Sequence, residues 1–139
     1  MKLNKKLNKN LVTYIISVTV LTLFFLFLIV CTQIGFDVKK RCELAQNRYG
    51  GKCVDALMRQ VADETNANGK NDAIWALGQL GDRKAITFLE KYDNHQDLPA
   101  REPWDKGISQ YELRKAIRLL RNGVNISAPF WRGYIVQAN

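Results

Sequence analysis

The chain has 139 residues, 47% of them hydrophobic, and a formal net charge of +8. This length allows one small domain behind an apolar N-terminal segment. Four of the positive charges (Lys2, Lys5, Lys6 and Lys9) precede that segment, so the rest of the chain is only mildly basic and a nucleic-acid partner is not expected.

Residues 11–36 carry no charged side chain and consist mainly of Leu, Ile, Val and Phe. A helix needs about 20 residues to cross the hydrocarbon of a bilayer, and in lipid a helix satisfies every backbone group internally. We therefore predict a basic tail over residues 1–10 and a transmembrane anchor helix over residues 11–36. A cleaved signal peptide fits less well, because its apolar stretch is shorter and ends at a small-residue cleavage site.

Cys31 follows Leu28-Ile29-Val30, a stretch that resembles a bacterial lipoprotein signal. That signal has Gly, Ala or Ser where this chain has Val30, so we interpret Cys31 as a small apolar residue of the anchor. Basic residues flank the anchor on both sides. The short basic tail is typical of a signal-anchor, which would leave the C-terminal domain outside the cytoplasm.

Helical periodicity continues beyond the anchor, with almost no strand-like alternation. A first helix places Val38, Cys42, Ala45 and Tyr49 on one face and ends at Gly50-Gly51. A second helix repeats apolar residues at Val54, Leu57, Met58 and Val61. Residues 63–70 form a polar loop in this prediction, and Asn71 or Asp72 caps the third helix.

The third helix runs to Leu80, where Gly81 stops it, and Asp82 caps a fourth. The fourth helix has an apolar face of Ala85, Phe88, Leu89 and Tyr92. Two prolines place a loop over residues 94–108. A last helix from about Ser109 to Arg121 has Leu113, Ala116, Ile117 and Leu120 facing inward, and the tail over residues 123–139 has no clear period.

The second and fourth helices repeat with a constant offset of 31 residues, which also carries Cys42 and Ala45 onto Ala73 and Ala76. The stretch Asp72-Ala-Ile-Trp-Ala-Leu-Gly-Gln-Leu-Gly-Asp82 resembles the HEAT-like repeats of the short, phycobilisome-lyase type. The resemblance implies an all-α fold in which residues 37–139 form a short α-solenoid of about two and a half helix pairs. The tail would then cover the open end.

By the same resemblance, the second helix of each pair would present a concave binding face. We expect that face to carry Asp55, Arg59, Arg83, Thr87, Glu90 and Lys91. A second surface is basic and lies on the last helix, at Arg114, Lys115, Arg118 and Arg121. It is either a solvated helix face or a contact for anionic lipid headgroups or an acidic partner.

Cys42 and Cys53 allow two structural interpretations, a disulfide between the first two helices or a pair of buried thiols. A simple antiparallel hairpin that closes at Gly50-Gly51 would place Cys53 opposite Arg48, which counts against a bridge. The spacing is not Cys-x-x-Cys, so a redox motif is absent.

No catalytic set, metal site or cofactor site stands out. The single histidine, His95, belongs to a polar loop, and the aromatic residues Phe130, Trp131 and Tyr134 are interpreted as core of the tail rather than as membrane-interface anchors. We therefore expect no enzyme and no cofactor, but a membrane-tethered module that binds an unknown protein or peptide. The alternatives are a structural, peripheral membrane protein that contacts lipid and an accessory to an enzyme complex.

Overall fold

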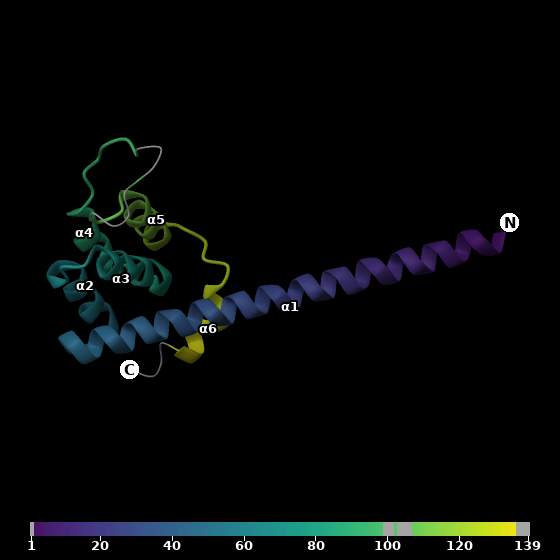
Figure 1. Cartoon of the computed structure of the whole chain (residues 1–139), viewed down its shortest axis with the longest axis horizontal. Coiled ribbons are helices and arrows are strands. Elements are labelled where there is room, and N and C mark those ends of the chain that lie inside the picture. The colour runs from purple at the N-terminus through teal and green to yellow at the C-terminus, as the bar shows by residue number, and fades with distance from the viewer. Residues whose placement is uncertain (1, 99–101, 103–106, 136–139) are drawn as a thin grey trace.

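The computed structural model describes residues 2–98, 102 and 107–135. The described residues form helices and no strands, which confirms the predicted all-helical class (Figure 1). The helices are α1 Lys2–Tyr49, α2 Cys53–Asp63, α3 Ala67–Leu80, α4 Ala85–Glu90, α5 Gln110–Arg121 and α6 Ala128–Ile135.

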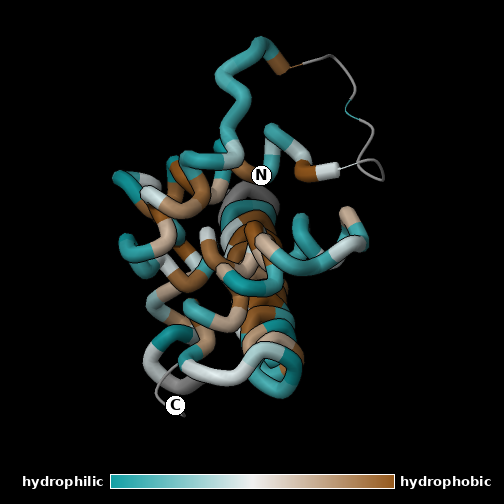
Figure 2. Tube along the Cα trace, turned by 90° about the vertical axis from the view of Figure 1, so that its left-hand side faces the viewer, coloured by the Kyte–Doolittle hydropathy of each residue, from teal (hydrophilic) through white to brown (hydrophobic). Residues whose placement is uncertain are grey.

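Helix α1 is one continuous rod of 48 residues that joins the predicted anchor to the predicted first helix of the domain (Figure 1). Among the described residues it is the one helix long and apolar enough to cross a membrane. Figure 2 looks toward its C-terminal end, with the hydrophobic stretch receding behind. The helix therefore has no break at the predicted boundary of residues 36–37, and burial against the domain begins earlier, at Cys31.

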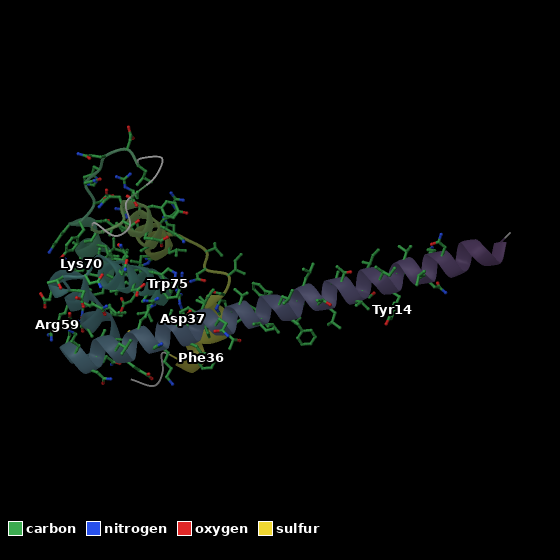
Figure 3. All side chains as sticks on the ribbon, in the orientation of Figure 1. Tyr14, Phe36, Asp37, Arg59, Lys70 and Trp75 are labelled. Atoms are coloured by element: carbon green, nitrogen blue, oxygen red, sulfur yellow. A yellow bond between two sulfur atoms is a disulfide. The ribbon has the colours of Figure 1, made fainter. Side chains whose placement is uncertain are left out.

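The apolar part of α1 projects away from the other helices and exposes its side chains, as at Tyr14 (68%) and Phe25 (56%) (Figure 3). Its hydroxyl groups are satisfied within the helix. Thr13, Ser17, Thr19, Thr22 and Thr32 each donate to the carbonyl four residues earlier, at 2.8–2.9 Å. These bonds reduce the cost of placing hydroxyls in an apolar medium.

The C-terminal part of α1 belongs to the domain, because Val38, Cys42 and Ala45 are buried in the core. Gly50 and Gly51 both have positive φ and reverse the chain there. The side chain of Gln46 donates to the Gly51 carbonyl at 3.1 Å, so the connection has returned to the level of Gln46 before α2 begins.

This return brings Cys42 and Cys53 together as a disulfide, with Cα atoms 5.0 Å apart. The simple hairpin register, with Cys53 opposite Arg48, does not describe the turn. Since the three-residue connection runs back along α1, α2 starts deeper along that helix than the register assumes. The bridge links the long helix covalently to the domain.

Helix α3 begins at Ala67, and its N-cap Asn66, which accepts from Asn68 N at 2.9 Å, lies five residues before the nearer predicted cap, Asn71. The predicted caps have other partners. Asn71 bonds Gly107 O (3.1 Å) and Ser109 N (2.8 Å), and Asp72 pairs with Arg41. The predicted stop is confirmed, since Gly81 is left-handed at φ 74°.

Helix α3 lies at the centre of the domain and packs against α2 on one side and α5 on another. Gly78 lies against Ala116 of α5 so closely that an added Cβ would be 2.8 Å from the Ala116 Cα. Helix α5 begins at Gln110, one residue after its predicted start, because Ser109 is the N-cap and its Oγ accepts from Glu112 N at 3.2 Å. Its four predicted inward residues are all buried.

The tail forms α6, which the sequence did not predict, and α6 packs mainly on α1 rather than covering α5. Trp131 is buried with Ala128, and the Phe130 ring meets the Phe27 ring edge-on at 5.5 Å between centroids. Asn125 starts the helix by accepting from Ala128 N at 3.2 Å. Residues 136–139 of the predicted tail and the Tyr134 side chain lie outside what the structure describes.

Candidate functional site

The residues of the predicted concave face divide into two groups. Arg59 lies at the end of the domain far from the exposed part of α1 and donates to the Tyr49 carbonyl at 2.8 Å (Figure 3). Asp55 forms an ion pair with Lys84, and the hydrogen bond from Lys84 lowers the pKa of Asp55. Thr87 and Lys91 are exposed on and just after α4.

Arg83 and Glu90, the remaining two residues of that predicted face, reach the end of α5 instead. Glu90 forms an ion pair with Arg121, and Arg83 Nη2 lies 3.5 Å from the Arg121 carbonyl oxygen. The structure therefore brings part of the predicted protein-binding face beside part of the predicted basic face.

Two members of the basic face have local partners. Arg114 is half-buried and donates to Asp93 and to the Gln96 carbonyl, which holds the start of the loop after α4. Hydrogen bonding from the His95 amide, and then from Arg114, holds the pKa of Asp93 below its usual range. Lys115 lies 3.6 Å from Glu112. Arg118 and Arg121 are exposed.

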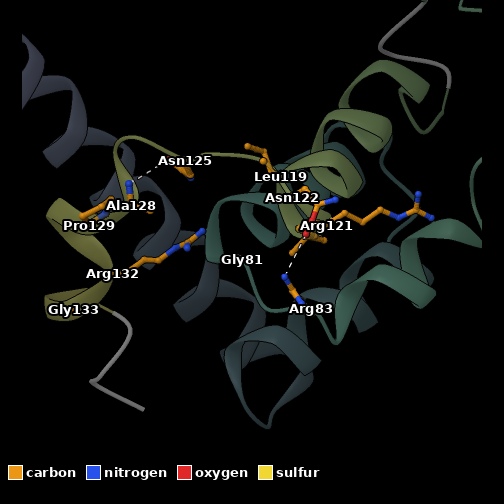
Figure 4. Close-up of a pocket in the computed structure, with 12 residues that line it drawn as sticks. Gly81, Arg83, Leu119, Arg121, Asn122, Asn125, Ala128, Pro129, Arg132 and Gly133 are labelled. Atoms are coloured by element: carbon orange, nitrogen blue, oxygen red, sulfur yellow. Dashed lines mark hydrogen bonds between the residues drawn. The ribbon is translucent and has the colours of Figure 1, made fainter.

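A cleft of about 580 Å³ opens between the C-terminal end of α5, the end of α3 and α6 (Figure 4). Three arginines line it, namely Arg83, Arg121 and Arg132, and no Asp or Glu is among its lining residues. Arg83 and Arg132 form no ion pair with any described residue. The cleft therefore has an excess of positive charge.

The side chain of Arg132 is held by hydrogen bonds to the end of α3. Its Nε donates to the Gln79 carbonyl at 3.0 Å, and its Nη2 donates to the same oxygen. The guanidinium lies against Gly81, where a Cβ would be less than 3 Å from three of its atoms. Burial lowers the pKa of Arg132, because taking the charge out of water disfavours it.

Sequence reasoning identified Arg83 and Arg121 but not Arg132. Arg132 lies 51 residues after Gly81, in a segment without a clear hydrophobic period, so no sequence spacing linked the two residues. The signal available was the left-handed glycine at Gly81, whose missing side chain leaves room for another group.

The part of the chain that the structure describes contains no group of three His, Cys, Asp or Glu side chains able to hold a metal ion. His95 is exposed, has positive φ and donates its amide to Asp93 at 2.9 Å. Its contacts belong to the loop that Arg114 orders.

The described residues define the class of protein: an all-helical domain that is continuous with one helix long and apolar enough to span a membrane. Comparisons with known proteins found no matching family model, no matching curated protein and no matching solved structure.

Proposed function

We propose that this protein is a non-enzymatic, membrane-tethered interaction module, with α1 spanning the bilayer and the helical domain docking a protein or peptide at its surface. The observation that carries the proposal is that the two parts of α1 have different surroundings. One half exposes apolar side chains to the surroundings, and the other half contributes Val38, Cys42 and Ala45 to the domain core.

The length of the apolar part of α1 matches the thickness of a bilayer. Residues 11–30 provide the roughly 20 residues that cross the hydrocarbon. The next residue, Cys31, is buried by protein rather than exposed. In this proposal lipid contact therefore gives way to protein contact at the point where α6 meets α1.

A continuous helix also makes the tether stiff. A flexible linker would let the domain sample many orientations, whereas α1 enters the core without a break and is bound to α2 by a disulfide. The domain would then be held at a fixed height over the membrane, which raises its effective concentration toward a membrane-bound partner.

We also propose that α1–α2 and α3–α4 are two HEAT-like helix pairs, with α5 as half of a third. Support comes from positions 31 residues apart. Cys42 and Ala73 are both buried, as are Ala45 and Ala76, at the same place in successive first helices. In that arrangement the docking face comprises Asp55, Arg59, Arg83, Thr87, Glu90 and Lys91, and no cofactor is involved.

An extracytoplasmic domain is part of the proposal. The disulfide supports it, because such bridges persist in oxidising compartments and are rare in the cytosol. To test it, a membrane-impermeant maleimide would be added to intact cells that express Asn8→Cys or Ala62→Cys. We expect label at residue 62 only, and label at residue 8 only would reverse the orientation.

Membrane integration is tested by alkaline carbonate extraction of membranes that contain the full chain. We expect the protein in the pellet, and a Leu21→Arg/Phe24→Arg variant in the supernatant, since each arginine costs about 2.5–3.5 kcal/mol at mid-membrane. Release of the unaltered chain by carbonate would contradict the spanning role of α1.

The docking face is tested with a photo-crosslinking residue at Thr87 or Lys91, and at exposed Asn47 of α1 as the matched control. We expect one discrete adduct from the α4 positions, lost in the Arg59→Glu variant and absent from the control. Equal adducts from all positions would argue against a defined face.

A further inference from the structure

We propose that the cleft lined by Arg83, Arg121 and Arg132 binds the phosphate of an anionic membrane phospholipid. This inference rests on the proposed spanning role of α1 and adds a ligand class to it. It assigns the cleft a function of its own beside the docking face, with which the cleft shares Arg83.

The charge of the cleft favours an anion. It has three guanidinium groups and no carboxylate in its lining, and of the three only Arg121 has a carboxylate partner, Glu90. A half-buried cation without a counter-charge gains when a fixed anion replaces water around it. Arginine also matches phosphate geometry, because its planar fork donates two parallel hydrogen bonds.

The position of the cleft favours a lipid as the source of that phosphate. The cleft is bounded by α6, and α6 contacts α1 at Phe27, within the last turn of the proposed lipid-embedded stretch. In Figure 1 the connection from α5 to α6, in yellow, extends further toward the N-terminal half of α1 than helices α2, α3, α4 and α5 do. The cleft therefore lies at the level of the headgroups.

The rim of the cleft supports the same conclusion. Val124 is 85% exposed, Ile126 is 67% exposed and Phe130 is 46% exposed, and all three lie in or next to the segment that bounds the cleft. Apolar side chains exposed beside cationic ones are typical of surfaces that enter the interfacial region of a bilayer. A site for free phosphate would not require them.

A single phospholipid would account for both the cationic cleft and the exposed apolar side chains beside it. Its phosphate would lie between Arg83 and Arg132, and its acyl chains would run down beside Ile126, Phe130 and Phe27 into the bilayer. Arg132 is already oriented for this by its bonds to the Gln79 carbonyl and by its packing on Gly81. Preorganisation of this kind lowers the entropy that binding must overcome.

The test uses the full chain in nanodiscs of phosphatidylcholine with a minority of phosphatidylglycerol, and native mass spectrometry identifies the lipids that stay bound to the protein. We expect preferential retention of phosphatidylglycerol. Arg83→Gln and Arg132→Gln should each weaken that preference about tenfold, the usual worth of a charge-assisted hydrogen bond.

Lys40→Gln is the matched control, since it removes a charge from an exposed position of α1 outside the cleft. Because Arg132→Gln also removes bonds within the fold, Arg132→Lys and a circular dichroism spectrum accompany it. Retained preference in Arg83→Gln, or an equal loss in Lys40→Gln, overturns the proposal.

Glycerol phosphate in solution separates a lipid from a free anion. Complete displacement of phosphatidylglycerol by millimolar glycerol phosphate would assign the cleft to a soluble ligand and overturn the lipid assignment. A chain that resists carbonate yet shows no anionic preference refutes this inference alone, whereas a chain that carbonate releases refutes the proposed spanning helix.

Discussion

Replacement of Gly78 by alanine is expected to destabilise the domain, although alanine is the better helix former. In an unpacked helix this substitution stabilises by about 1 kcal/mol, because glycine loses more backbone entropy on folding. At Gly78, however, the new Cβ would lie 2.8 Å from the Ala116 Cα and 2.9 Å from its Cβ. Packing therefore opposes propensity.

The size of the destabilisation by Gly78→Ala follows from which atoms must move to make room for the new Cβ. The nearest atoms belong to the backbone and Cβ of α5, so no flexible side chain can rotate away, and α3 and α5 must separate by about 0.6 Å to restore ordinary contact. Overpacking of this kind costs about 1–3 kcal/mol. After the propensity gain of about 1 kcal/mol is subtracted, we expect a net loss of about 1 kcal/mol and at most about 2, at roughly 4–8 °C in Tm per kcal/mol.

Gly133→Ala is the matched control, since Gly133 is also helical but a Cβ there meets nothing within 4 Å. It should keep or slightly raise the Tm. Thermal unfolding of the full chain in detergent, followed by near-ultraviolet circular dichroism, measures both variants. If Gly78→Ala were as stable as Gly133→Ala, the close approach of α3 and α5 would be refuted.

Three further predictions concern other parts of the domain. Removing the bridge with Cys42→Ala/Cys53→Ala should cost about 3 kcal/mol by loop entropy for a separation of 11 residues, measured by urea unfolding against the oxidised chain. The folded pKa of Asp93 is lower than its unfolded pKa, so ionised Asp93 stabilises the fold above about pH 4 and this stabilisation is lost as the pH falls below that value. Asp93→Asn should remove the stabilisation and flatten the acid limb of a Tm–pH profile. Trp131→Ala should cost about 3–5 kcal/mol and loosen α6 from α1, so that the buried thiol of Cys31 reacts with a membrane-permeant maleimide; an unreactive Cys31 in that variant would contradict the packing of α6.

Local signals were sufficient wherever a helix end is fixed by its own residues. Gly81 was predicted as a stop because a left-handed glycine acts on the adjacent turn of backbone. Helix α5 begins within one residue of its predicted start, because Ser109 caps its own first turn. The start of α3 was wrong because two suitable caps, Asn66 and Asn71, lie close together, and only the tertiary contacts of Asn71 with the start of α5 decide between them.

The disulfide, too, depends partly on local sequence and partly on tertiary structure. Two cysteines near one helix end made a bridge possible, but whether they meet depends on how far the connection runs back along α1. The two left-handed glycines and the extended Lys52 set that path. A register counted from the sequence alone does not contain it.

The sequence by itself determined the helical class, the long apolar segment, the inward face of α5 and the buried positions Leu57 and Val61 of α2, because hydrophobic period and capping act over a few residues. Only the tertiary structure decided that α6 returns to α1 and that Arg83, Arg121 and Arg132 share one cleft. Arg83 and Arg132 are 49 positions apart and Phe27 and Phe130 are 103 apart, so these contacts depend on the packing of every helix between them.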